Sequence, residues 1–332
     1  MTSFYDCRKT TIKYGYEAEY FWVTGILLVI VGFLGLLGNL INLVILCHKE
    51  LRSKIFYNLL AALAFFDALF IASYGIDWSY TSLACQPTND NVYYVMRFFS
   101  DIGGSGSIYT TIVVSLERLN RILKPRISSR PNVCMYIVPI LTLIVTFNFP
   151  AFLDIGYLIA NGTGNSSSMP EWTESTAYHY YEWWTSILFY TAVPLILLIV
   201  VNAAIIFKMY QLKKLRKAAF PTHRRRLVSI RILLTVVLVF LVSHFLLILQ
   251  QFLYYFASEE HYFHWNFITP IASFCILINS SVNFIIYSVL NKKFRLIFYQ
   301  MFKLKRCISS NIDNYPLSKT KDEFGTEYIL KY

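Results

Sequence analysis

The sequence predicts an all-α membrane protein, a seven-transmembrane helix bundle with a short amphipathic membrane-surface helix after span seven. Composition is the first observation: 56% of the 332 residues are hydrophobic, 15% are charged, and the mean hydropathy is +0.48. Soluble domains are nearer half apolar and a quarter charged. The second observation is that apolar segments long enough to cross about 30 Å of hydrocarbon as a helix recur along the chain. The third is that positive charge gathers on one side of these segments. Together these observations exclude a soluble protein with a large core.

Seven apolar segments fill most of residues 21–291, which we expect to form the bundle. The third segment carries the most small and polar residues, among them Gly103, Gly104 and Gly106. Small residues let helices approach closely, so this span is expected at the centre, surrounded by protein. The predicted spans are Trp22–Cys47, Ile55–Ile76, Val92–Ile122, Val133–Ile159, Trp183–Tyr210, Leu227–Phe256 and Phe263–Leu290.

Lysine and arginine set the orientation of these spans. Of the 30 such residues, 26 fall on one side. Loops rich in them stay in the cytoplasm, so residues 1–20 are expected outside the cell and the tail 307–332 inside. The tail is mostly polar and is expected to be disordered. A net charge of +11 would also suit nucleic acid, but localised charge on an apolar chain indicates a lipid bilayer and no nucleic-acid partner. We therefore expect a multi-pass protein of the plasma membrane.

Residues 292–306, after the seventh span, have one apolar face between cationic flanks. Such a helix lies on the inner membrane surface. Cys307 follows it directly and is either a palmitoylation site or an unmodified thiol. The apolar positions of the face, spaced i, i+3, i+4, i+7 and i+8, are Phe294, Ile297, Phe298, Met301 and Phe302.

Two glycosylation triplets begin at Asn161 and Asn165, in a loop that the predicted orientation places outside. The sequence holds no metal-ligand cluster, nucleophile–base set or phosphate loop, which argues against an enzyme. Internal repeats, which a transporter of this kind would have, are also missing from the sequence.

Several motifs at the inner ends and centres of the spans resemble the rhodopsin-like G-protein-coupled receptors. Glu117-Arg118, with Pro125 seven residues after the arginine, looks like the E/D-R-Y motif and the loop that follows it. The other matching positions are Gly38-Asn39 in span one, Asp67 in span two, Pro194 in span five, and Asn283 to Tyr287 in the N-P-x-x-Y place. The runs Ile278–Tyr287, Val242–Phe245 and Asn148–Pro150 are similar to the invertebrate FMRFamide-type neuropeptide receptors.

The chain departs from the family pattern at several of its usual positions. Tyr93 stands where the family carries the disulfide cysteine of span three, so Cys7 and Cys85 either pair with each other or remain two free thiols. The usual tryptophan of span four is missing, and His244 replaces the switch tryptophan of span six. Further replacements are Leu246 for a proline, Leu119 for the tyrosine of E/D-R-Y, and Asn202 for a tyrosine of span five.

The resemblance implies an output site on the cytoplasmic side. Glu117 would restrain Arg118 at rest, and activation would free Arg118 to meet a G protein while Tyr287 swings inward. Pro125 and Asn283 belong to the same set. Arg226 stands where many relatives carry an acid that latches the arginine, so a weaker restraint is expected. Arrestin and a receptor kinase are further implied partners.

The resemblance also places polar and apolar residues at the centre of the bundle. Asp67, with Ser107, Asn279 and Asn283, would either bind a sodium ion or form a hydrogen-bonded cluster without an ion. No other cofactor is expected. A transmission core between the ligand site and the inner half would consist of Ile108, Pro194, Phe240 and His244.

The expected ligand is an amidated, FMRFamide-like peptide with a cationic end; the alternative is a small molecule read by an invertebrate chemosensory receptor. A biogenic amine is disfavoured because Ser100 stands where amine receptors have an aspartate, and retinal because residues 263–291 lack a lysine. Arg97 and Asp101 either contact ligand or form a structural i,i+4 pair. The ligand-binding candidates are Asp77, Arg97, Asp101, Glu182, His244, Gln250, Gln251 and Tyr254.

Overall fold

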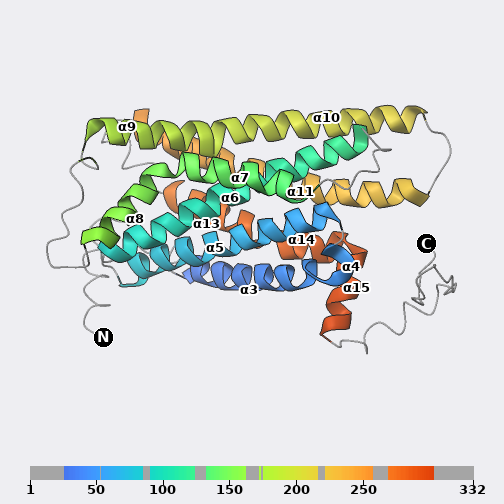
Figure 1. Cartoon of the computed structure of the whole chain (residues 1–332), viewed down its shortest axis with the longest axis horizontal. Coiled ribbons are helices and arrows are strands. Elements are labelled where there is room, and N and C mark those ends of the chain that lie inside the picture. Colours follow the sequence, from blue (N-terminus) through green and yellow to red (C-terminus); the bar gives the residue numbers. More distant parts are fainter. Residues whose placement is uncertain are drawn as a thin grey trace.

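The computed structural model describes residues 26–52, 54–84, 90–123, 132–161, 172, 175–215, 221–256 and 268–302. Its helices run side by side along the long axis, and α15 crosses that axis at the end where α4 lies (Figure 1). The elements are α3 (Leu28–Leu46), α4 (Lys49–Arg52), α5 (Ile55–Ala84), α6 (Asp90–Leu123), α7 (Cys134–Phe147), α8 (Phe149–Asn161), α9 (Thr176–Thr185), the π-helix η4 (Ser186–Ala192), α10 (Val193–Leu215), α11 (Pro221–Phe256), α13 (Ile268–Ser281), α14 (Asn283–Leu290) and α15 (Lys292–Met301).

By length and apolar composition, only some of the described helices qualify as membrane spans. Among the described residues, four helices pass, or up to six when α7 with α8 and α13 with α14 each count as one bent span. The long helix that does not pass is α6, whose mean hydropathy is lowered by its charged, small and polar residues. Its middle is buried inside the protein, as expected for a central span, so lipid does not have to solvate those groups.

The helices extend beyond the predicted spans in several places. Helix α5 continues to Ala84 instead of ending at Ile76, α9 begins at Thr176 before the predicted Trp183, and α11 begins at Pro221 before Leu227. A helix satisfies its own backbone hydrogen bonds, so it need not stop where the apolar run stops. The predicted starts at Trp22 and Phe263 lie outside the described residues.

Helices α5 and α6 pack in close contact through glycine. A Cβ added to Gly103 would meet the backbone nitrogen of Phe70 at 2.5 Å and the carbonyl oxygen of Phe66 at 3.0 Å. A Cβ at Gly106 would overlap the Phe66 ring. The small residues seen in the sequence therefore set the distance between these two helices.

Two spans bend sharply where helical hydrogen bonding is interrupted. The break between α7 and α8 turns the chain by 63° at Asn148, just before Pro150, which has no backbone N–H to continue the ladder. The break between α13 and α14 at Val282 is 42°. In span five, the wide turn of η4 lies immediately before Pro194.

After the seventh span, α15 covers Lys292–Met301 of the predicted 292–306, and part of its apolar face packs on the bundle. Phe294 and Ile297 are fully buried in the main core, whereas Met301 and Phe302 are exposed. The Asn291 side chain caps the helix by accepting from the Phe294 N–H at 3.2 Å. The exposed side chains of Met301 and Phe302 are available to contact a membrane, and residues from 303 onward lie outside the described chain.

Candidate functional site

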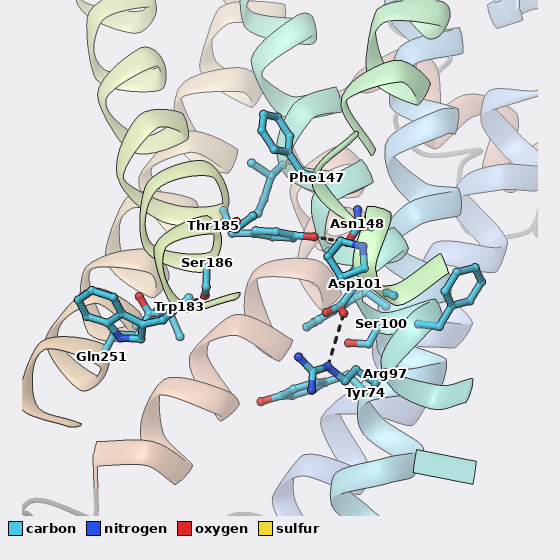
Figure 2. A pocket seen from close by; sticks show the side chains of 18 of the residues that line it. Tyr74, Arg97, Ser100, Asp101, Phe147, Asn148, Trp183, Thr185, Ser186 and Gln251 are labelled. Carbon is cyan, nitrogen blue, oxygen red and sulfur yellow. Dashed lines mark hydrogen bonds and ion pairs between the residues drawn. The ribbon is translucent and has the colours of Figure 1, made fainter. Parts of the chain in front are cut away.

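A cavity of about 900 Å³ opens among the outer halves of the helices. Its walls come from α5, α6, α8, α9, η4, α11 and α13, so most spans contribute to it. Figure 2 shows Arg97 and Asp101 on the α6 side, with Trp183, Ser186 and Gln251 across from them. A cavity of this volume is at the upper end of the range for small-molecule sites and has room for the end of a peptide.

One wall carries an arginine beside a carboxylate. Arg97 Nε lies 3.8 Å from Asp101 Oδ2, beyond hydrogen-bond distance, and both side chains are 36% exposed. The two residues are spaced i,i+4 on α6 and form an ion pair. Both also line the cavity, so the paired side chains face the space that a ligand would occupy. A loose, half-exposed pair can exchange partners with an incoming charged group at low cost.

A chain of hydrogen bonds links this part of α6 to spans four and five. The Tyr190 hydroxyl donates to Asn148 Oδ1, and Asn148 Nδ2 donates to Ser105 Oγ at 3.0 Å and to the Ile144 carbonyl at 2.7 Å. Ser105 Oγ in turn donates to the carbonyl of Asp101 at 2.6 Å. The Asn148 side chain thus adds a second donor to the Ile144 carbonyl, which also accepts the Asn148 backbone N–H at 3.0 Å. Through Ser105 it also fixes the turn of α6 that presents Asp101.

The opposite wall carries an amide with one unused acceptor. Gln251 Nε2 donates to Ser186 Oγ at 2.9 Å, while its Oε1 is buried without a hydrogen-bond donor among the described residues. Gln250, the neighbouring residue, is half-buried outside the cavity lining.

Asp154 on α8 lines the cavity near α9. Its two carboxylate oxygens accept from Tyr178 Oη at 2.8 Å and from Trp172 Nε1 at 3.4 Å. Sequence reasoning did not select Asp154, although a carboxylate inside a predicted span is itself a signal for a functional or paired group. The two partners of Asp154 lie 18 and 24 positions farther along the chain, a separation that no spacing rule reveals.

Beneath the cavity, an imidazole stacks on a phenyl ring. The rings of His244 and Phe240 are 3.6 Å apart at an interplanar angle of 17°, and the His244 Nδ1–H donates to the Phe240 carbonyl at 3.0 Å. Ile108 belongs to the same core as Phe240, and Pro194 is buried on α10. His244 and Ile108 also line the cavity, so the expected transmission core adjoins it directly.

The predicted polar centre forms around Asp67, which is fully buried. Ser107 Oγ donates to Asp67 Oδ1 and Asn283 Nδ2 donates to Asp67 Oδ2, both at 2.6 Å. Within the described chain, Asn283 Oδ1 and Asn39 Oδ1 are buried oxygens without a donor. Asn279 lines the cavity together with Ser107, so the cavity reaches this centre from outside. One buried carboxylate and unused amide oxygens fit a small hard cation, which prefers oxygen ligands.

At the other end of α6, a buried carboxylate lies between two arginines. Glu117 is 2% exposed, and its Oε1 accepts from Arg121 Nε at 3.0 Å. Arg118 Nε lies farther away, 3.7 Å from Glu117 Oε2. The Arg118 guanidinium carbon lies 3.3 Å from the centroid of the Phe56 ring on α5. The predicted Glu117–Arg118 pair is therefore present, but it is the looser of the two contacts that Glu117 makes.

Comparison with known proteins gives these sites a context. A model of the family "7 transmembrane receptor (rhodopsin family)" matches residues 38–287. The chain belongs to the rhodopsin family of seven-transmembrane receptors. As a rhodopsin-family receptor it is a multi-pass membrane protein and not an enzyme, and both the predicted family and the predicted fold class are confirmed.

The receptor is similar to several characterised invertebrate proteins. It is 29% identical over 331 residues to a Drosophila melanogaster FMRFamide receptor, covering 92% of this chain and 59% of that protein. It is 28% identical over 177 residues to a Gq-coupled rhodopsin of Mizuhopecten yessoensis, covering 49% of this chain and 34% of that protein. The crystal structure of squid rhodopsin matches its fold with a TM-score of 0.65 at 20% identity, covering 88% of this chain and 87% of the other.

The receptor's remaining predicted residues lie in different settings. Of the ligand candidates, Arg97, Asp101, His244 and Gln251 line the cavity, whereas Asp77 is half-buried on α5 outside its lining. Tyr287 is buried in the core and packs against Phe294, with a ring distance of 6.0 Å. Positions or side chains outside the described part of the chain are Cys7, Cys85, Pro125, Asn161, Asn165, Glu182, Arg226, Tyr254 and Cys307.

Proposed function

We propose that this receptor sits in the plasma membrane, binds an amidated, FMRFamide-like neuropeptide from outside, and activates a G protein inside. The observation that carries the ligand class is the loosely paired Asp101 carboxylate, half-exposed in a cavity of about 900 Å³. The similarity to an FMRFamide receptor supports the same ligand class; the chain covers 59% of the length of that protein.

A cationic peptide would enter by exchanging partners at Asp101. Its guanidinium would displace Arg97 and form a charge-assisted hydrogen bond with the Asp101 carboxylate, shorter than the present 3.8 Å separation. Burying the peptide end strengthens this contact, because the cavity excludes water that would screen it. His244, in contact with Phe240 below, would meet the deepest part of the peptide.

On the cytoplasmic side, Arg118 would leave its resting contacts and meet the G protein. Glu117 and Tyr287 belong to the same output region, with Pro125 in the adjoining loop. Arrestin and a receptor kinase are proposed as further partners of the cytoplasmic tail. Asp67, Ser107 and Asn283 would hold a sodium ion, whose positive charge would balance the buried Asp67 carboxylate.

A screen of surface-expressed receptor against matched peptides tests this function. The probes are Phe-Met-Arg-Phe-amide and the same peptide with citrulline replacing arginine, which keeps the shape and removes the charge. We expect a G-protein response to the arginine peptide that the citrulline peptide reproduces only at about tenfold or higher concentration. Silence of well-expressed receptor across amidated peptides, with responses to small odorants, would instead support the chemosensory alternative.

A further inference from the structure

Arg118 is held most closely by an aromatic ring. Its guanidinium carbon lies 3.3 Å from the centroid of Phe56, in the first turns of α5, and its side chain is only 18% exposed. A guanidinium over the face of an aromatic ring is attracted by the negative face of the ring, and more strongly where water is excluded. Phe56 itself is 4% exposed, so this contact is largely desolvated.

The nearby carboxylate is mainly engaged with another residue. Glu117 Oε1 accepts from Arg121 at 3.0 Å, whereas 3.7 Å separates Glu117 Oε2 from Arg118 Nε. Arg118 Nε has no hydrogen-bond acceptor among the described residues. Span six offers no attraction through Arg226, because that residue is itself a cation. Among the described residues, the ring of Phe56 is therefore the closest partner of the Arg118 guanidinium and fixes the direction of that side chain.

The ring is fixed by its surroundings. Phe56 belongs to the main core and packs edge-on against Tyr57, with a ring distance of 5.4 Å. The helices that carry Phe56 and Arg118 are also close-packed, since Gly103 lies against the backbone of Phe70. Sliding one helix along the other would create overlaps, so a change of the Arg118 rotamer separates the pair more easily than helix movement does.

We propose that Phe56 is the positioning residue that holds Arg118 at rest, through a cation–π contact that takes the place of a latch from span six. The role of Arg118 in the output rests on the proposed function; the contact between the two side chains does not. Phe56 acts only through Arg118 and has no part in binding the G protein.

Fluorination of the Phe56 ring tests the contact in the full-length receptor. Adding one, two and three fluorines weakens the negative ring face stepwise with little change in shape. We expect the melting temperature of purified receptor to fall stepwise with Arg118 present and to stay level in an Arg118→Met background. The matched control is fluorination of Phe65, a 53% exposed ring on the same helix, which should give no dependence on Arg118. Parallel trends in the two backgrounds would overturn the inference.

Agonist-free capture of G protein tests the positioning role on the same variants. Capture per surface receptor should rise about threefold or more with fluorination and in Phe56→Leu, and should stay near wild type in Phe56→Tyr, which keeps the π face. Capture that stays level across the series, in a receptor that responds to peptide, would overturn the positioning role. An Arg118-dependent melting trend in a receptor that captures no G protein even with peptide would confirm the contact and contradict the proposed function instead.

Discussion

The two ends of α6 use the same residue types in opposite ways. At the outer end, Arg97 and Asp101 are 3.8 Å apart and both are 36% exposed. At the inner end, the Glu117 side chain is 3% exposed and accepts from Arg121 at 3.0 Å. Burial makes the difference, because a desolvated charge must keep its partner while an exposed one can exchange it. The outer pair is therefore suited to ligand binding and the inner cluster to a resting restraint.

The largest expected contrast is between the two arginines. Arg118→Ala should abolish the maximal response to peptide at normal surface expression, because the proposed output group is gone. Arg97→Ala should keep the maximal response and raise the potency of a cationic peptide, because Asp101 loses its competing partner. Dose–response curves on surface-labelled cells measure both. An equal loss of response in both variants would contradict the division of roles along α6.

The next largest contrast is expected between the carboxylates of Glu117 and Asp101, in the level of agonist-free signalling. Glu117→Gln should raise agonist-free signalling severalfold, because it removes the charge that holds both inner arginines. Arg121→Met should raise it less, because Glu117 keeps its charge and still has Arg118 as a partner, 3.7 Å away. Asp101→Asn serves as the outer control and should leave the agonist-free level unchanged. A level that does not move in Glu117→Gln would argue against a restraint at this end.

The smallest expected effect concerns the network under Asp101. Tyr190→Phe removes the hydroxyl that donates to Asn148, and should lower the free energy of unfolding by about 1 kcal/mol. Peptide potency should fall slightly and agonist-free signalling should not change. Denaturation of purified receptor, together with the two signalling assays, measures this. A large rise in agonist-free signalling would mean that the network restrains the inner end as well.

Much of this arrangement could be read from the sequence because it depends on local pattern. Apolar runs predicted the spans, and the small and polar residues of the third span predicted that it would be central and surrounded by protein. The cluster of Asp67 with Ser107 and Asn283 followed from family positions, and in the structure each of these two residues donates a hydrogen bond of 2.6 Å to the Asp67 carboxylate.

Contacts between distant residues could not be read in this way. Phe56 is an ordinary apolar residue in its own span, and only the packing of α5 on α6 brings it to Arg118. The bond between Tyr190 and Asn148 depends on the 63° break in span four, since the bend sets the direction of the Asn148 amide. The ends of α5, α9 and α11 were also missed, because each of these helices extends beyond its apolar run.

The contact between Asp101 and a cationic ligand group is central to the proposed function of this receptor. Its most direct test is a double-mutant cycle that combines Asp101→Asn with the arginine-to-citrulline change in Phe-Met-Arg-Phe-amide, with Asp77→Asn as the matched control. If the two charges meet, Asp101→Asn should reduce the potency of the arginine peptide by about 10- to 100-fold and that of the citrulline peptide hardly at all. Equal losses for both peptides would show that Asp101 does not bind the peptide's charge, and would contradict the proposed ligand contact.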